Sequence, residues 1–242
     1  MDKSPESHDL ANLPNSRRRV IACATVMEEI LPFLPGEVTY EILDFGLHLR
    51  PGELKKTLQD KIDQASQTAD VLLLGYGLCS MAVVNLHATT ATLVIPRVDD
   101  CISIFLGSGQ AYHQQARQEP GTYYLTKGWI EVGDSPFEEY KRMIEKYGEE
   151  KSKRMINLML KNYKRLAFIN TGQYEIERYQ AYAQQTAHQF GLRYEEIAGS
   201  PALIKKLVFG PWDGEFVVVA PGQSVKYEDF TPPPPAARKK DG

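Results

Sequence analysis

The chain has 242 residues, 43% of them hydrophobic, and its 28 basic and 31 acidic side chains leave a formal charge of −3. A chain of this length buries roughly 70–75% of its surface on folding and needs no disulfide or metal ion for stability. The balanced charge and short apolar runs exclude a strong electrostatic site for nucleic acid and a membrane span, so we expect a cytoplasmic protein.

Polar, proline-containing segments flank the body of the chain. Residues 1–17 and 226–242 are predicted to be disordered tails, the second because four consecutive prolines precede a basic cluster. Between the tails, apolar β-branched runs alternate with amphipathic segments, which is typical of an α/β protein. We expect strands at residues 19–24, 38–43, 71–75, 92–97, 122–126, 165–170, 193–197 and 215–220.

The amphipathic segments between these strands predict helices. They cover residues 27–34, 51–69, 101–117, 136–147, 150–163, 174–190 and 201–208. This order of elements favours a mainly parallel, doubly wound, Rossmann-like sheet in one α/β domain, residues 18–225. The charged segment 136–164 is predicted to be a helical linker between two lobes, 18–131 and 165–225.

The three cysteines follow three different predicted strands. Cys23 closes the first strand, whereas Cys79 and Cys101 come a few residues after the strands at 71–75 and 92–97. Because the carboxyl ends of parallel strands share one edge, we expect the three thiols to lie together. Each also precedes or begins a predicted helix, and a helix N-terminus favours thiolate.

Three thiolates without a fourth cysteine suit a zinc ion or a [4Fe–4S] cluster with one open position. The opposing interpretation is that the cysteines are structural, since cysteine is often buried as a small apolar residue. A fourth metal ligand is expected from His48, which follows the second predicted strand, or from His87. We favour His48, because it lies at the same edge as the thiols.

Other candidate residues lie in the turns at this edge. Arg97 is a candidate to bind an anionic group of a substrate. Asp100 is a candidate for proton transfer, although an Asp before a helix is also a preferred N-cap. Backbone that approaches a ligand is expected at Gly75, Gly77, Gly107 and Ser108. The aromatic residues Tyr123, Tyr124, Trp129 and Trp212 are expected to pack in the core.

Several short blocks between the tails resemble an uncharacterised family of bacterial and archaeal proteins of unknown function. The blocks are Cys23 with Glu28 and Glu29, Leu47 and His48 with Pro51, residues 75–79, Pro96 and Arg97 with residues 100–102, Gly107 with Ser108, and residues 121–124 with Gly128 and Trp129. The usual family form has a histidine where Asp99 stands, which removes one potential metal ligand here. The three cysteines and His48 all fall within these blocks.

Genes of this family often lie near those of corrinoid-dependent methyltransferases. The resemblance therefore implies a place in one-carbon or corrinoid-linked methyl metabolism, with a corrinoid protein or methyltransferase as a partner. Together these features predict a metal-binding α/β protein that acts on a small molecule, as a metal-dependent transferase or lyase. The alternative is a non-catalytic accessory or small-molecule-binding protein with structural cysteines.

Overall fold

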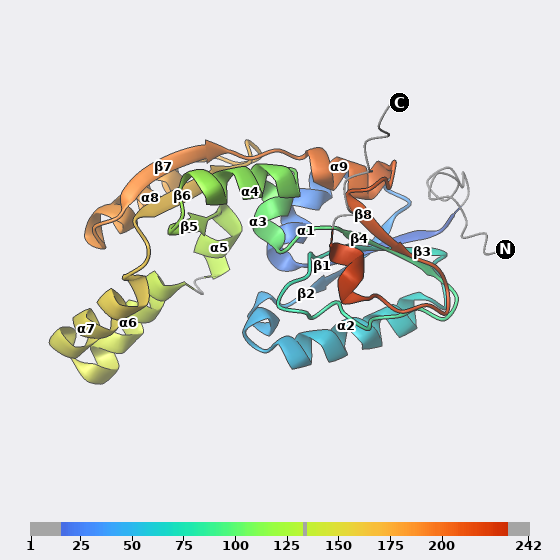
Figure 1. The fold of residues 1–242 in the computed structure, drawn as a ribbon, viewed down its shortest axis with the longest axis horizontal. Coiled ribbons are helices and arrows are strands. Elements are labelled where there is room, and N and C mark those ends of the chain that lie inside the picture. Colours follow the sequence, from blue (N-terminus) through green and yellow to red (C-terminus); the bar gives the residue numbers. More distant parts are fainter. Residues whose placement is uncertain (1–15, 133–134, 232–242) are drawn as a thin grey trace, which may run out of the picture.

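A computed structural model describes residues 16–132 and 135–231 of the chain (Figure 1), so the predicted tail segments 1–15 and 232–242 lie outside the described residues. The α/β class is confirmed, and its strands form two sheets. The strands are β1 (Arg18–Cys23), β2 (Thr39–Leu43), β3 (Val71–Gly75), β4 (Thr92–Pro96), β5 (Thr122–Leu125), β6 (Arg165–Asn170), β7 (Arg193–Ala198) and β8 (Phe216–Val219). Each of the eight expected strands is present, and no bound differs from the expected one by more than one residue.

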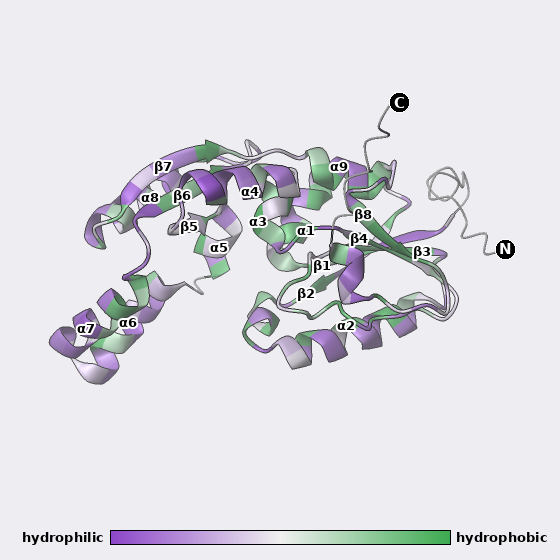
Figure 2. Cartoon of the chain, viewed as in Figure 1, coloured by the Kyte–Doolittle hydropathy of each residue, from purple (hydrophilic) through white to green (hydrophobic). Residues whose placement is uncertain are grey.

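The larger sheet has five strands in the order β2-β1-β3-β4-β8. The first four are parallel, and β8 runs antiparallel to β4 at one edge. Every residue of β3 and β4 is buried, because helices cover both faces of a parallel sheet. The smaller sheet, β5-β6-β7, is wholly parallel. Figure 2 shows the contrast between the hydrophobic β8 and the mostly hydrophilic, half-exposed β7.

The helices are α1 (Ala24–Ile30), α2 (Pro51–Ala65), α3 (Cys101–Phe105), α4 (Gly109–Gln118), α5 (Lys127–Val132), α6 (Pro136–Tyr147), α7 (Glu149–Leu160), α8 (Glu177–Gln189) and α9 (Ala202–Phe209). Short 3-10 helices are η1 (Leu31–Phe33), η2 (Phe45–Leu49) and η3 (Tyr227–Phe230). Figure 1 shows α2 on one side of the large sheet and α1 and α9 on the other. Among the described helices, none is long and apolar enough to cross a membrane.

Three predicted segments differ from the structure. The predicted helix at 101–117 is two helices, because Gly107 adopts φ +84° and Ser108 then caps α4. Part of the predicted tail at 226–242 is ordered, since η3 forms within it. The lobes also divide differently: β5 joins the small sheet, and β8 returns to the large one. The chain therefore crosses between the sheets more often than the predicted boundaries imply.

The segment from 136 to 160 forms a helical hairpin, α6 and α7, at one end of the molecule (Figure 1). Its apolar residues Phe137, Ile156 and Leu160 pack in a second core with Leu166 and Phe168 of β6. The hairpin therefore supports the small sheet and lies away from the carboxyl edge of the large sheet.

Candidate functional site

The carboxyl edge of the large sheet brings together the residues singled out by the sequence. Cys23 is the last residue of β1, Cys79 follows β3, and Cys101 is the first residue of α3 after β4. His48 lies in η2, directly after β2. Because β2, β1, β3 and β4 are consecutive neighbours in the sheet, these side chains come from the ends of four adjacent parallel strands.

A pocket of about 320 Å³ opens at this edge. Its lining is Phe45, His48, Leu49, Cys79, Ser80, Asp99, Asp100, Cys101 and Trp129. Cys23 does not line it, since its side chain is only 1% exposed and its Sγ lies 3.3 Å from Oγ1 of Thr25. The pocket therefore reaches two of the three thiols directly.

The turn that carries Cys79 has an unusual backbone. Cys79, Ser80 and Met81 have φ values of 44°, 55° and 70°, a left-handed conformation that non-glycine residues rarely adopt. Two hydrogen bonds tie the turn to the segment before α3, from Leu78 N to Val98 O at 2.8 Å and from Cys79 N to Asp99 O at 2.9 Å. Strained residues of this kind persist where the surrounding structure holds them, often at functional sites.

Burial dominates the protonation of the thiols. It raises the pKa of Cys79 to about 12 and that of Cys101 well above its ordinary value, and it also raises the pKa of Cys23. The thiols lie within electrostatic reach of one another, since Cys23 further raises the pKa of Cys79, and both raise that of Cys101. Burial raises the pKa of each thiol more than the backbone hydrogen bonds at these positions lower it, which opposes the expectation that helix N-termini favour thiolate.

His48 is held with one ring nitrogen free. Its Nδ1 lies 2.9 Å from the carbonyl oxygen of Phe45, so Nδ1 donates and Nε2 is left as the acceptor. Nε2 is buried and has no hydrogen-bond partner among residues 16–132 and 135–231. The ring lies between two aromatic neighbours, Phe45 with centroids 5.0 Å apart and Tyr76 at 6.0 Å. A histidine fixed through one nitrogen with the other bare is the usual arrangement of a metal ligand or acceptor.

The other candidate histidine lies elsewhere. His87 is exposed, pairs through its backbone with Ser224, and lines a different pocket together with Arg17 and Asp70 near the start of β1. The structure therefore separates His87 from the thiols and groups His48 with them.

Of the charged candidates, the two aspartates line the pocket and the arginine does not. Asp100 lines the pocket and also caps α3, accepting from Ile102 N at 2.9 Å, and burial raises the pKa of its carboxyl. Asp99 lies at the exposed rim, 3.8 Å from Nε2 of His113. Arg97 does not line the pocket; its Nη2 donates to the carbonyl oxygen of Phe216 on β8.

The candidate backbone positions have packing explanations. A Cβ at Gly75 would lie 2.6 Å from Cβ of Ala22, and one at Gly77 would lie 2.6 Å from Val98 O. Gly107 turns the chain with a positive φ against Ser200, and the hydroxyl of Ser108 caps α4 by accepting from Ala111 N. Gly77 bears on the site indirectly, because its lack of a side chain lets the Cys79 turn approach the Cys101 turn. None of the four lines the pocket described above.

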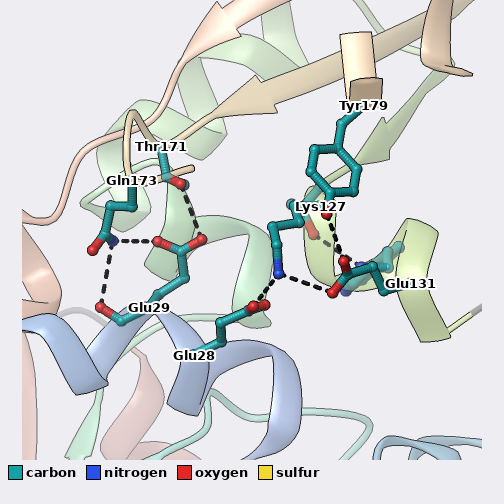
Figure 3. Close-up of polar contacts among 9 residues, drawn as sticks. Glu28, Glu29, Lys127, Glu131, Thr171, Gln173 and Tyr179 are labelled. Carbon is teal, nitrogen blue, oxygen red and sulfur yellow. Dashed lines mark hydrogen bonds and ion pairs between the residues drawn. The ribbon is translucent and has the colours of Figure 1, made fainter. Parts of the chain in front are cut away.

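Trp129 is partly buried and packs against both hydrophobic cores, as expected, and it also forms one wall of the pocket. It lies on α5, which approaches α1 closely because the neighbouring Gly128 has no side chain: a Cβ there would lie 2.9 Å from Cβ of Thr25. Figure 3 shows the polar contacts that fix this approach. Lys127 of α5 bonds both Glu28 of α1 and Glu131.

A second set of contacts in Figure 3 joins α1 to the loop after β6. The carboxylate of Glu29 accepts from Thr171 Oγ1 at 3.0 Å and from Nε2 of Gln173. Glu29 is only 4% exposed, and this burial raises its pKa. These contacts tie the small sheet to the helix that follows Cys23, so both sheets position the pocket.

Fold and site together define an α/β protein of Rossmann-like topology, with a thiol- and imidazole-lined pocket at the carboxyl edge of its parallel strands. The sequence model of one family, described as "Protein of unknown function (DUF1638)", matches residues 42–208. The chain belongs to this family. Searches of curated proteins and of solved structures gave no match.

Proposed function

We propose that the chain is a metal-binding protein whose centre, a zinc ion or a [4Fe–4S] cluster, is held by Cys23, Cys79 and Cys101 with His48 as a further ligand. The observation that carries this proposal is Nε2 of His48, which is buried, has no hydrogen-bond partner in the described part of the chain and lies in the same pocket as two thiols. A buried acceptor without a partner costs about 1–3 kcal/mol, and a metal ion would satisfy it.

The protonated thiols are compatible with this proposal. A metal ion displaces the proton of a coordinating thiol outright, so thiols with a raised pKa can still become ligands. Within residues 16–132 and 135–231, no three Cys, His, Asp or Glu side chains are already placed to hold one ion. Binding would therefore require side-chain rotations at the edge, for which the pocket beside Cys79 and Cys101 offers room.

The pocket is the proposed substrate site. A small molecule would enter from the open side of the pocket and take the place of His48 on the centre, because three protein thiolates alone leave one position open. The family resemblance suggests that the reaction belongs to one-carbon or corrinoid-linked methyl metabolism in the cytoplasm, catalysed by a metal-dependent transferase or lyase. A corrinoid protein or methyltransferase is the proposed partner.

One observation favours a second candidate, an accessory or small-molecule-binding protein with structural thiols. Cys23 is almost fully buried and already contacts the hydroxyl of Thr25. Cysteine in such a position is stable as a small apolar residue without any metal.

Purification without oxygen, followed by metal analysis and an absorption spectrum, separates the two candidates. The proposal predicts one zinc ion, or the iron and sulfide of one brown cluster, in each chain. Cys79→Ser, Cys101→Ser and His48→Ala should each lower the metal content, whereas the matched control His87→Ala should retain it. A colourless protein without zinc or iron would contradict the metal centre and favour the accessory or small-molecule-binding role.

A further inference from the structure

The charge of the pocket opposes the anionic substrate that the sequence suggests. Asp99 and Asp100 contribute two carboxylates, and the described residues that line the pocket include no lysine or arginine. Arg97, the residue expected to bind an anion, instead donates to the carbonyl oxygen of Phe216. A pocket lined by charges of one sign attracts ligands of the opposite sign. A centre of three thiolates and one zinc ion would be negative as well, so metal binding would not reverse this preference.

The walls of the pocket are aromatic. The rings of Phe45 and Trp129 lie with centroids 5.9 Å apart and planes inclined by 60°, so they are direct neighbours in the wall of the pocket. Both residues line the pocket, and they come from η2 and α5. The face of an aromatic ring attracts cations, tryptophan most strongly, and aromatic walls recognise alkylated ammonium groups. Leu49 adds an apolar surface that suits the alkyl substituents of such a group.

The volume limits the ligand to a small molecule. At about 320 Å³, the pocket is near the lower end of the range for small-molecule sites. Asp99 at the exposed rim and the half-buried Asp100 line the same pocket as the two rings, so a cation held by the rings would share the pocket with two carboxylates. A hydrated inorganic cation would gain little from the apolar walls, whereas an alkylated one would gain from both.

We propose that this pocket binds a small organic cation with an alkylated ammonium head, against the rings of Phe45 and Trp129 and beside the carboxylates of Asp99 and Asp100. This inference deepens the proposed function, because it rests on the same pocket and names the class of substrate. Cys79 and Cys101 line the same pocket, so the bound cation would lie next to the proposed centre.

Choline tests the proposal against two matched probes, 3,3-dimethylbutan-1-ol, which has the same shape without the charge, and acetate, which has the opposite charge. Binding to the full chain is measured by calorimetry and by tryptophan fluorescence, with and without added salt. We expect saturable choline binding that is about tenfold tighter than that of the neutral alcohol, because the cation–π and charge contributions are lost in the alcohol. Equal affinity for choline and the alcohol, or tighter binding of acetate, would overturn the proposal.

Two variants test whether Trp129 and Asp100 contact the bound choline. Trp129→Leu and Asp100→Asn should each weaken choline binding about fivefold or more, and Asn keeps the cap of α3 because Asn and Asp cap helices equally well. Asp60→Asn, which removes an exposed carboxylate from α2, is the matched control and should bind choline as the parent does. Undiminished binding by a folded Trp129→Leu protein would contradict the proposal, and the comparison of probes on the unchanged chain tests it even if a variant does not fold.

The same titration on the parent chain after metal analysis separates this inference from the proposed metal centre, and Cys79→Ser, which should lose metal, should still bind choline selectively. Selective choline binding by a parent chain that holds no metal when purified without oxygen would support the inference and contradict the metal centre. A chain that holds metal but prefers acetate would contradict the inference alone.

Discussion

The close approach of α5 to α1 gives the sharpest test of how the pocket is built. A Cβ added at Gly128 would lie 2.9 Å from both Cβ and Cγ2 of Thr25 and 3.3 Å from its Cα. Because Thr25 is buried at the start of α1, it has little freedom to move. Gly128→Ala must therefore push α5, and with it Trp129, away from the pocket.

The expected magnitude follows from two opposing effects. Replacing a helical glycine by alanine at a compatible position stabilises a protein by about 0.4–1 kcal/mol. Overpacking a filled contact costs about 1–3 kcal/mol. We therefore expect Gly128→Ala to lower the free energy of unfolding by about 0–2.6 kcal/mol, and not to raise it.

Gly52 provides a matched control, since it is also the second residue of its helix, α2, and a Cβ there would meet nothing within 4 Å. Gly52→Ala should raise the free energy of unfolding by about 0.4–1 kcal/mol. Urea denaturation followed by circular dichroism measures both variants. If Gly128→Ala stabilised the protein as much as Gly52→Ala does, the close packing of α5 on α1 would be refuted.

Three further predictions concern charge, thiols and the Cys79 turn. Burial raises the pKa of Glu29 above its ordinary value of 4.5, so the stability that Glu29 contributes is present below pH 4.5 and is lost as the pH rises through the raised value. Glu29→Gln should therefore gain stability relative to the parent as the pH rises, as measured by urea denaturation. A stability difference that does not change with pH would contradict this. Because the pKa of Cys79 is raised to about 12, the metal-free native protein should react slowly with a thiol reagent at pH 8. All three cysteines should react at once in urea, and rapid labelling of the native protein would contradict the raised pKa. Gly77→Ala would place a Cβ 2.6 Å from Val98 O, so it should lower the free energy of unfolding measured in urea by about 1–3 kcal/mol. It should also lower the metal content, and unchanged values of both would contradict the proposed link between the Cys79 turn and the Cys101 turn.

Local sequence patterns predicted most of the fold, because the strands of the large sheet are apolar runs bounded by turn residues. Every residue of β3 and β4 is buried, and such runs are recognisable without tertiary information. The common edge of the three thiols followed from the same pattern, since it depends only on which residues come after parallel strands.

The features that the sequence did not predict depend on tertiary contacts. The short helix α5 contains a glycine and is fixed by the ion pairs of Lys127 with Glu28 and Glu131, so its own residues predict it weakly. The place of Trp129 in the pocket follows from that helix. The raised pKa of the thiols depends on burial, which the helix-dipole argument leaves out.

Arg97 illustrates a further limit. Its surroundings are set by β8, which pairs antiparallel with β4 although more than a hundred residues separate them, and whose Phe216 supplies the carbonyl oxygen that Arg97 contacts. A local motif of arginine, aspartate and cysteine could not indicate that the guanidinium lies away from the pocket.

The measurement that tests the metal centre most directly is the number of protons released when zinc is added to the metal-free protein. Because burial keeps the three thiols protonated and His48 already has a bare nitrogen, binding through all four should release about three protons for each zinc ion. Each Cys→Ser variant should release about one proton fewer, and His48→Ala should bind zinc more weakly without changing that number. Zinc binding that releases no protons, or no zinc binding by a chain that also holds no iron–sulfur cluster when purified without oxygen, would contradict the proposed centre.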